Sequence, residues 1–305
     1  SMRFITCRTP DGSLVPAILS PDGNTVWPLR WLGLPAETLA EAIPLLTPQV
    51  RAGLSLALGG IPGIPREAVQ LDSPIPHPVQ DVICLGINYL SHSEEAERYS
   101  AQAFAAPHTD AIYFSKRVSR AVPDGAAIPP HTRLVKKLDY ECELAVVLGQ
   151  DAKDLTPGHT QDAVFGYTIL NDVSARDQQT THKQWYFGKS LDGFAPMGPC
   201  IVTADEFDTY PPRLGLRCWV NDQLRQDANT AQQIFDIDHV LCELTAGMTL
   251  RAGTIIATGT PAGVGMGMQP PCFLQPGDVV RCEIEGIGTL TNPVGEADPE
   301  PELNS

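Results

Sequence analysis

Short apolar runs bounded by glycine, proline or polar residues recur along the chain and predict many short β-strands. The first two runs, residues 4–7 and 14–19, flank an Asp11-Gly12 turn signal. Further predicted strands cover residues 82–85, 144–148, 165–170, 200–202, 214–220, 254–257 and 279–284. Helical patterns are fewer and are predicted over residues 36–58, 88–98, 174–180 and 236–247. Many strands with few helices favour a β-rich α+β fold, a β-sandwich or roll, over a doubly wound sheet.

A proline-rich segment divides this pattern. Residues 59–81 have the composition of a linker, with five prolines: Pro62, Pro65, Pro74, Pro76 and Pro78. We therefore predict a small N-terminal α+β domain over residues 1–78 and a second domain over residues 79–305.

Composition narrows the class of protein. The chain has 305 residues, enough for a full hydrophobic core, and carries 21 Lys and Arg against 36 Asp and Glu, a net charge of −15. This charge opposes binding to nucleic acid or an anionic membrane and favours small substrates or cations. The first residues lack the apolar core of a signal peptide, and the eight cysteines form no C-x-x-C pair. We expect a cytoplasmic protein with buried free thiols.

Acidic residues give the first chemical signal. Glu141 and Glu143 are two apart in a predicted strand and project on the same face, so their charges repel unless a cation lies between them. Mg²⁺ and Mn²⁺ prefer such oxygen ligands. Asp172 follows the strand at residues 165–170 and is a third candidate. The alternatives are an acidic strand face and, for Asp172, a helix cap or turn residue.

Three further features have both a catalytic and an ordinary interpretation. His92 and Glu95 are three apart on a predicted helix, so a carboxylate can orient an imidazole that activates water; a solvated His-Glu pair is the alternative. Lys189, between aromatic residues, either polarises a carbonyl group or lies on the surface. Residues 258–263 offer hydroxyl and N–H groups to an anion, or form a tight turn.

Taken together and in order, several motifs resemble those of the fumarylacetoacetate hydrolase family. The resemblance covers residues 79–295 and is weaker for the first segment. Its motifs are Gly86-Ile87-Asn88-Tyr89 with His92, Asp139-Tyr140-Glu141-Cys142-Glu143-Leu144, Gly166-Tyr167, Asn171-Asp172-Val173-Ser174-Ala175-Arg176-Asp177, Gly188-Lys189-Ser190, and Thr258-Gly259-Thr260-Pro261-Ala262-Gly263-Val264-Gly265.

The resemblance implies a catalytic domain built as a mixed β-sandwich roll, a homodimer, and Mg²⁺ or Mn²⁺ as the cofactor. The metal ligands implied by motif match are Glu141, Glu143 and Asp172. The implied catalytic residues are the His92–Glu95 dyad and Lys189, and the implied substrate-binding residues are Asn88, Tyr89, Gln179 and Thr260.

Asn88 stands where fumarylacetoacetate hydrolase itself has an aspartate, which argues against the substrate of that enzyme. Residues 96–112, including Tyr99, Phe104 and His108, are expected to line a lid that selects the substrate.

The implied chemistry stabilises the enolate of a small 2-oxo acid. Hydrolysis of a carbon-carbon bond in an acylpyruvate, giving pyruvate and a carboxylic acid, is our first expectation. Oxaloacetate decarboxylation, or hydration or isomerisation in aromatic-ring catabolism as by 2-hydroxyhepta-2,4-diene-1,7-dioate isomerase, uses the same site without that hydrolysis. A non-catalytic interaction protein is the rival from another class, and the intact His92, Glu95 and Lys189 argue against it.

Overall fold

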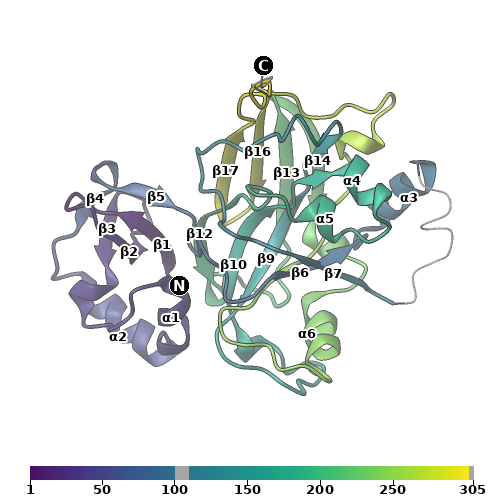
Figure 1. Ribbon diagram of the computed structural model, residues 1–305. Coiled ribbons are helices and arrows are strands. Elements are labelled where there is room, and N and C mark those ends of the chain that lie inside the picture. The colour runs from purple at the N-terminus through teal and green to yellow at the C-terminus, as the bar shows by residue number, and fades with distance from the viewer. Residues whose placement is uncertain (100–109, 302–305) are drawn as a thin grey trace.

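The computed structural model describes residues 1–99 and 110–301 and shows a small N-terminal unit beside a larger strand-rich body (Figure 1). The small unit contains β1 (Arg3–Arg8), β2 (Leu14–Leu19), β3 (Thr25–Pro28), β4 (Ile64–Pro65) and β5 (Gln70–Asp72). The predicted linker thus contributes two of these strands, β4 and β5, to the fold.

The helical part of this unit is broken, so the prediction of one helix over residues 36–58 is wrong. The structure has α1 (Leu39–Ala42), a 3₁₀ turn (Ile43–Leu45) and α2 (Pro48–Leu58). Pro44 and Pro48 have no backbone N–H to continue a helix, and the Thr47 hydroxyl accepts a hydrogen bond from Val50 N to begin α2.

The larger body is a sandwich of two sheets. One layer contains β6 (Val82–Gly86), β7 (Ile112–Lys116), β9 (Cys142–Leu148), β10 (Val164–Asn171), β12 (Met197–Thr203) and β15 (Ile255–Ala257). The other contains β13 (Gly215–Val220), β14 (Gln223–Asn229), β16 (Val279–Ile284) and β17 (Gly288–Pro293). The pairs are antiparallel except β15 with β6, which is parallel. This is the mixed β-sandwich roll predicted above.

Most predicted strands are present, with ends that differ by a few residues. The predicted strand over residues 279–284 coincides with β16. Residues 223–229 are too polar for their pattern to predict a strand, but their pairing with β13 makes them β14. Long-range pairing therefore decides where the apolar pattern does not.

The first layer continues into the N-terminal unit. Its order is β4-β3-β2-β1-β12-β10-β9-β15-β6-β7, because β1 pairs with β12 through Arg3 with Val202 and Phe4 with Ile201. The Phe4 ring also packs on Phe165 of β10, with ring centroids 5.4 Å apart. The division at residue 78 remains a prediction. The large sheet and the contact between Phe4 and Phe165 both join the two sides of that division.

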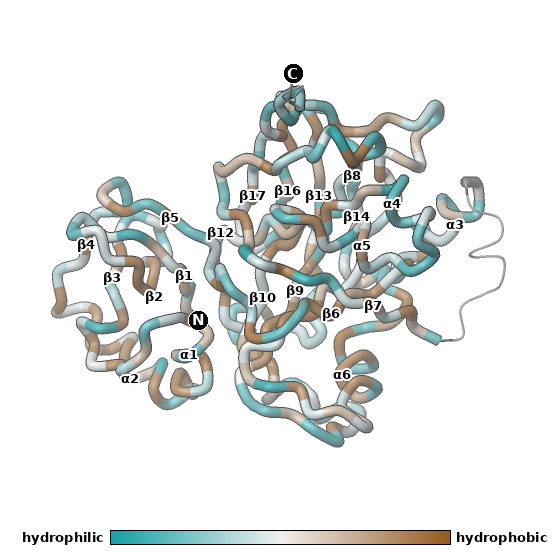
Figure 2. The backbone as a smooth tube through the Cα atoms, viewed as in Figure 1, coloured by the Kyte–Doolittle hydropathy of each residue, from teal (hydrophilic) through white to brown (hydrophobic). Residues whose placement is uncertain are grey.

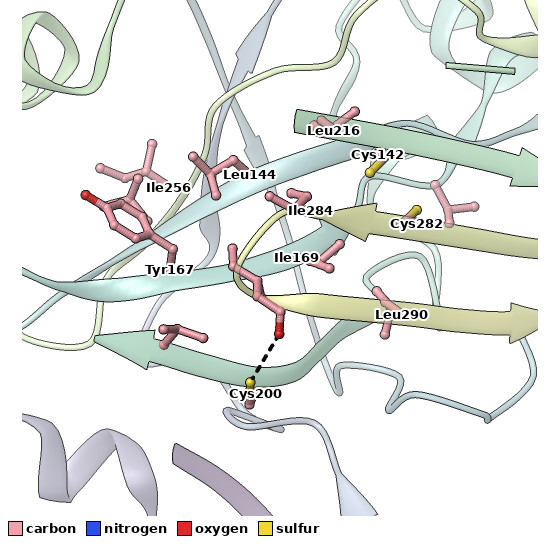
Figure 3. Close-up of a cluster of buried hydrophobic side chains, with 14 of the residues drawn as sticks. Cys142, Leu144, Tyr167, Ile169, Cys200, Leu216, Ile256, Cys282, Ile284 and Leu290 are labelled. Carbon is pink, nitrogen blue, oxygen red and sulfur yellow. Dashed lines mark hydrogen bonds between the residues drawn. The ribbon is translucent and has the colours of Figure 1, made fainter. Parts of the chain in front are cut away.

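The core lies between the two layers. Leu144 of β9 and Ile169 of β10 face Leu216 and Ile284 of the second sheet (Figure 3), and all four side chains are fully buried. Hydrophobic segments run through this interior along β9, while α4 (Arg176–Thr181) is hydrophilic (Figure 2). This packing fixes the adjoining ends of β9 and β10, where Glu141, Glu143 and Asp172 lie.

The remaining helices flank the sandwich. α6 (Ile237–Thr245) agrees with its prediction and is capped by Asp236, whose side chain accepts from His239 N. α3 (Leu90–Tyr99) begins after Asn88, and α4 begins at Arg176 because Ser174–Ala175 forms β11, which pairs with β8 (Leu138–Asp139). No helix within residues 1–99 and 110–301 has both the length and the apolar character that crossing a bilayer requires.

Candidate active site

Three buried carboxylates meet at the adjoining ends of β9 and β10. Leu170 of β10 pairs with Glu143, and Asp172 N donates a 2.8 Å hydrogen bond to Glu141 O. One oxygen from each of Glu141, Glu143 and Asp172 lies within 4.8 Å of the others. Glu143 and Asp172 are fully buried and Glu141 is 6% exposed. The structure therefore brings together the three predicted ligands, and the exposed acidic strand face is excluded.

Lys189 lies between two of these carboxylates. It ends α5 (Tyr186–Lys189), and its Nζ lies 3.1 Å from Glu141 Oε1 and 2.9 Å from Asp172 Oδ2. The side chain is 2% exposed, so the interpretation as a surface lysine is wrong. Burial alone lowers the pKa of a lysine, but Asp172 and Glu141 outweigh it and raise the pKa of Lys189. Lys189 is thus an ammonium group held in the site.

A second buried lysine was not identified from the sequence. Lys116 ends β7, is fully buried, and its Nζ lies 2.9 Å from Asp172 Oδ1. The same ammonium donates to the carbonyl oxygens of Val173, Lys189 and Phe194. No local motif marks this lysine, because its partners come from distant segments of the chain.

An arginine completes the positive side of the cluster. Arg176 Nη1 lies 2.8 Å from Glu141 Oε2, and Arg176 Nε donates to Asp139 Oδ2 at 3.0 Å. The next residue, Asp177, accepts from Lys136 N through Oδ2. Burial acts to raise the pKa of Glu141, but Lys189 and Arg176 outweigh it and lower that pKa.

Glu143 differs from its two neighbours and provides a test of whether a cation fits. Its Oε1 accepts a 2.9 Å hydrogen bond from Gly259 N, while its buried Oε2 has no hydrogen-bond partner among the described residues. Burial, then Asp172 and Glu141, raise the pKa of Glu143 well above the usual range. A hard divalent cation would satisfy the unpaired oxygen and remove the repulsion, so the donor set fits Mg²⁺ or Mn²⁺.

His92 and Glu95 form a buried pair on α3. His92 Nδ1 lies 3.1 Å from Glu95 Oε1, and the two residues are 5% and 3% exposed. Gly263 N donates to Glu95 Oε2 and Gly259 N, four residues earlier, donates to Glu143 Oε1, so one short segment joins the dyad to the acidic cluster. The alternative of a solvated pair on a helix surface is therefore wrong.

The glycine-rich segment at residues 258–267 organises both halves of the site. Gly259 N donates to Glu143, and Gly263 N donates to Glu95 Oε2 at 2.8 Å. Gly267 packs against the Glu95 carboxyl group so closely that a Cβ would overlap with it. The N–H groups expected to bind an anion thus bind carboxylates of the chain itself.

The four predicted substrate-binding residues differ in what their side chains contact. Asn88 donates to Phe235 O and Thr258 O and accepts from Phe235 N, and Thr260 Oγ1 donates to Cys142 O. Tyr89 OH accepts a long 3.4 Å hydrogen bond from Gln233, and Gln179 Oε1 accepts from Arg176 at 3.3 Å. Asn88 and Thr260 thus fix the backbone around the site, and Gln179 lies beside its arginine. Substrate binding by all four stays a prediction.

The predicted lid falls mainly outside the described residues. Phe104 and His108 lie in the segment 100–109, and α3 ends at Tyr99 immediately before it. Ala96, on the described part of α3, is fully buried. The role of the segment in choosing a substrate stays a prediction.

Comparison with known proteins identifies the family of this chain. Residues 81–295 match the family model described as fumarylacetoacetate (FAA) hydrolase C-terminal. The chain is a member of the fumarylacetoacetate hydrolase family. Its strand-rich sandwich and its acidic cluster are those expected of an enzyme of this family.

Three relatives illustrate the range within the family. The chain is 43% identical over 227 residues to oxaloacetate tautomerase YisK of Bacillus subtilis (strain 168), covering 74% of this chain and 73% of the relative. The structure of fumarylacetoacetate hydrolase from psychrophilic Exiguobacterium antarcticum superposes with a TM-score of 0.82 at 38% identity, covering 98% of this chain and 100% of that one. Maleylpyruvate hydrolase from Sphingobium sp. SYK-6, in complex with manganese(II) and pyruvate, gives a TM-score of 0.77 at 27% identity, covering 97% and 100%.

Proposed function

We propose that this protein is a Mg²⁺- or Mn²⁺-dependent enzyme that interconverts the keto and enol forms of a small 2-oxo acid, with oxaloacetate as the first candidate. The observation that carries the proposal is that residues 259–263 join a buried His92–Glu95 dyad to a carboxylate cluster that retains an unpaired oxygen on Glu143. Tautomerisation requires a base at the carbon beside the keto group and positive charge at the oxygen. This site offers both.

The residues of the chain have separable roles in this proposal. Glu141, Glu143 and Asp172 would hold the divalent ion, which when bound supplies positive charge to a developing enolate oxygen. Lys189 and Arg176 add fixed positive charges within the same buried cluster. His92 takes a proton from the carbon beside the keto group, and Glu95 fixes the imidazole orientation and stabilises its charged form.

Keto–enol tautomerisation needs no second reactant. One proton leaves the carbon and one proton is added to the former keto oxygen, so the reaction consumes no water and breaks no carbon-carbon bond. Burial of His92 and Glu95 favours this outcome because it limits access of water to the base. The 43% identity to an oxaloacetate tautomerase supports the choice of substrate.

Hydrolysis of an acylpyruvate is the second candidate, and the same dyad supports it if water reaches the imidazole. An imidazole paired with a carboxylate activates water as readily as it abstracts a carbon-bound proton. The hydrolase relative determined with manganese(II) and pyruvate supports this candidate at lower identity. The two reactions differ in whether pyruvate is released.

The test uses chelator-stripped protein to which Mg²⁺ or Mn²⁺ is added back. Enol-oxaloacetate, acetylpyruvate and fumarylpyruvate are supplied separately, and loss of enol absorbance, pyruvate and CO₂ are followed. Faster loss of enol absorbance without pyruvate or CO₂ supports the tautomerase. Pyruvate without CO₂ from an acylpyruvate would establish the hydrolase instead, and CO₂ from oxaloacetate a decarboxylase.

A matched control separates the dyad from a general effect of histidine removal. His92→Ala is expected to abolish the metal-dependent rate. His239 makes a similar contact with Glu243 on α6, at 3.6 Å, but is exposed. His239→Ala is expected to retain full activity, and equal losses in both variants would contradict the proposal.

A further inference from the structure

Asp139 lies between the glycine-rich segment, which binds Glu95, and Arg176, which binds Glu141. Its carboxylate is fully buried and accepts four N–H groups, two on each oxygen. Oδ1 accepts from Tyr140 N at 2.9 Å and Gly265 N at 2.8 Å. Oδ2 accepts from Met266 N at 2.9 Å and Arg176 Nε at 3.0 Å. The described residues therefore saturate this carboxylate, and it is not a ligand waiting for a cation.

On one side, Asp139 holds the glycine-rich segment. The amides of Gly265 and Met266 that it binds lie two and three residues after Gly263, whose N–H donates to Glu95 Oε2. Gly265 approaches so closely that an added Cβ would lie 2.9 Å from Asp139 Oδ1. The position of Asp139 thus determines the position of the amide that holds the His92–Glu95 dyad.

On the other side, Asp139 holds Arg176. The guanidinium group uses Nε for Asp139 and Nη1 for Glu141, so the two carboxylates bind different edges of one rigid plane. Removing the Asp139 interaction takes away the acceptor of Nε, one of the contacts that orient the guanidinium plane toward Glu141. The orientation of Glu141 is therefore set in part by a carboxylate outside the metal-binding set.

We infer that Asp139 is a positioning residue that couples the His92–Glu95 half of the site to the carboxylate half. The coupling runs from Glu95 through residues 263–266 to Asp139, and from there through Arg176 to Glu141. The catalytic part of this inference rests on the proposed function, but the metal-binding part does not, because it is measured without a substrate.

Asp139→Asn is the direct test. An asparagine side chain of the same shape has one acceptor oxygen, so whichever way it turns it leaves two of the four N–H groups facing an amide NH₂. We expect Mn²⁺ affinity, measured by electron paramagnetic resonance of free Mn²⁺, to fall about 10-fold or more. Asp72→Asn is the matched control: Asp72 is also buried, accepts from Ser73 N and pairs with Arg120, but lies in β5. It is expected to leave Mn²⁺ affinity unchanged.

A double variant tests the connection to the dyad. At saturating Mn²⁺, which offsets the weaker metal binding, the loss of kcat in Asp139→Asn combined with Glu95→Gln will not exceed that of the worse single variant if Asp139 acts through the glycine-rich segment. Multiplied losses would overturn the coupling, and Mn²⁺ affinity within twofold of wild type in folded Asp139→Asn would overturn the positioning role. Near-UV circular dichroism reports folding.

A second variant covers the case in which Asp139→Asn fails to fold. Gly265→Ala keeps the carboxylate but adds a Cβ that would lie 2.1 Å from Cys272 O and 2.9 Å from Asp139 Oδ1, so the segment must shift relative to both. It is expected to weaken Mn²⁺ binding in the same direction, and unchanged affinity in this variant would overturn the inference. If the proposed function fails because no substrate is turned over, the Mn²⁺ measurements still decide the positioning role.

Discussion

Lys116 Nζ lies 2.9 Å from Asp172 Oδ1, and neither side chain is exposed to solvent. The same ammonium group satisfies three carbonyl oxygens from residues 173, 189 and 194. One lysine thus connects β7 to the segment after β10, to the last residue of α5 and to Phe194. Its loss removes the cation beside Asp172 Oδ1 and the ammonium donor of three carbonyl groups, and leaves Asp172 paired with Lys189.

Lys116→Met is therefore expected to lower the free energy of unfolding by about 3–5 kcal/mol. Equilibrium denaturation in urea measures this change. The exposed pair Arg217–Asp227, at 3.2 Å, supplies the control, and Arg217→Met is expected to cost about 0–1 kcal/mol. Equal effects of the two substitutions would contradict the importance assigned to burial.

Replacement of Glu143 is expected to separate metal binding from stability. Glu143→Gln replaces a buried carboxyl group whose pKa is raised by burial and by Asp172 and Glu141. Because the charged form of this group is unfavourable there, its loss is not expected to destabilise the metal-free protein. The neutral amide is a poorer ligand for a hard cation, and Mn²⁺ affinity is expected to fall at least about 10-fold.

Thermal unfolding with and without Mn²⁺ measures both quantities on one sample. Wild type is expected to gain stability with added Mn²⁺, and Glu143→Gln to gain much less at the same concentration. Full metal-induced stabilisation of the variant would show that Glu143 is not a ligand.

Gly267→Ala is expected to lower activity through Glu95. A Cβ at Gly267 would overlap with the Glu95 carboxyl group, which must move and release His92 Nδ1. We expect kcat to fall at least about 10-fold, as in Glu95→Gln, because both changes remove the oriented base.

Gly53 provides a glycine without such a neighbour. It lies in α2, and apart from its chain neighbours and the backbone of that helix no atom lies within 4 Å of the position that an added Cβ would take. Gly53→Ala is therefore expected to leave kcat unchanged and to stabilise the protein by up to about 1 kcal/mol. A similar loss of kcat in both alanine variants would contradict the role given to Gly267.

Removal of residues 1–78 tests the predicted division of the chain. The truncation deletes β1 and exposes the edge of β12 at Ile201 and Val202, together with the face of Phe165 that packs on Phe4. Because an unpaired apolar strand edge promotes association, we expect residues 79–305 to aggregate on size-exclusion chromatography. A monodisperse, active fragment would instead show that the two parts are independent.

Much of the site could be predicted from the sequence because the residues involved are close together along the chain. Alternation in a strand predicts that Glu141 and Glu143 share a face, and helical spacing predicts the contact between His92 and Glu95. Lys116, Asp139 and Arg176 have no comparable signal as a set, since each is defined by partners from other strands and loops. The same reason explains the polar strand β14, whose pairing with β13 no local pattern reveals.

The pairing of β1 with β12 also has a consequence for synthesis on the ribosome. The first strand pairs with residues about 200 positions later, so its partner emerges about 10–40 s after it at usual elongation rates. During that interval the edge of β1 that later binds β12 is exposed on a nascent chain, and Phe4 lacks its cover of Phe165. Closure of this sheet depends on contacts of high sequence separation and has to wait until β12 has been synthesised, so the nascent chain carries an unpaired strand edge until then.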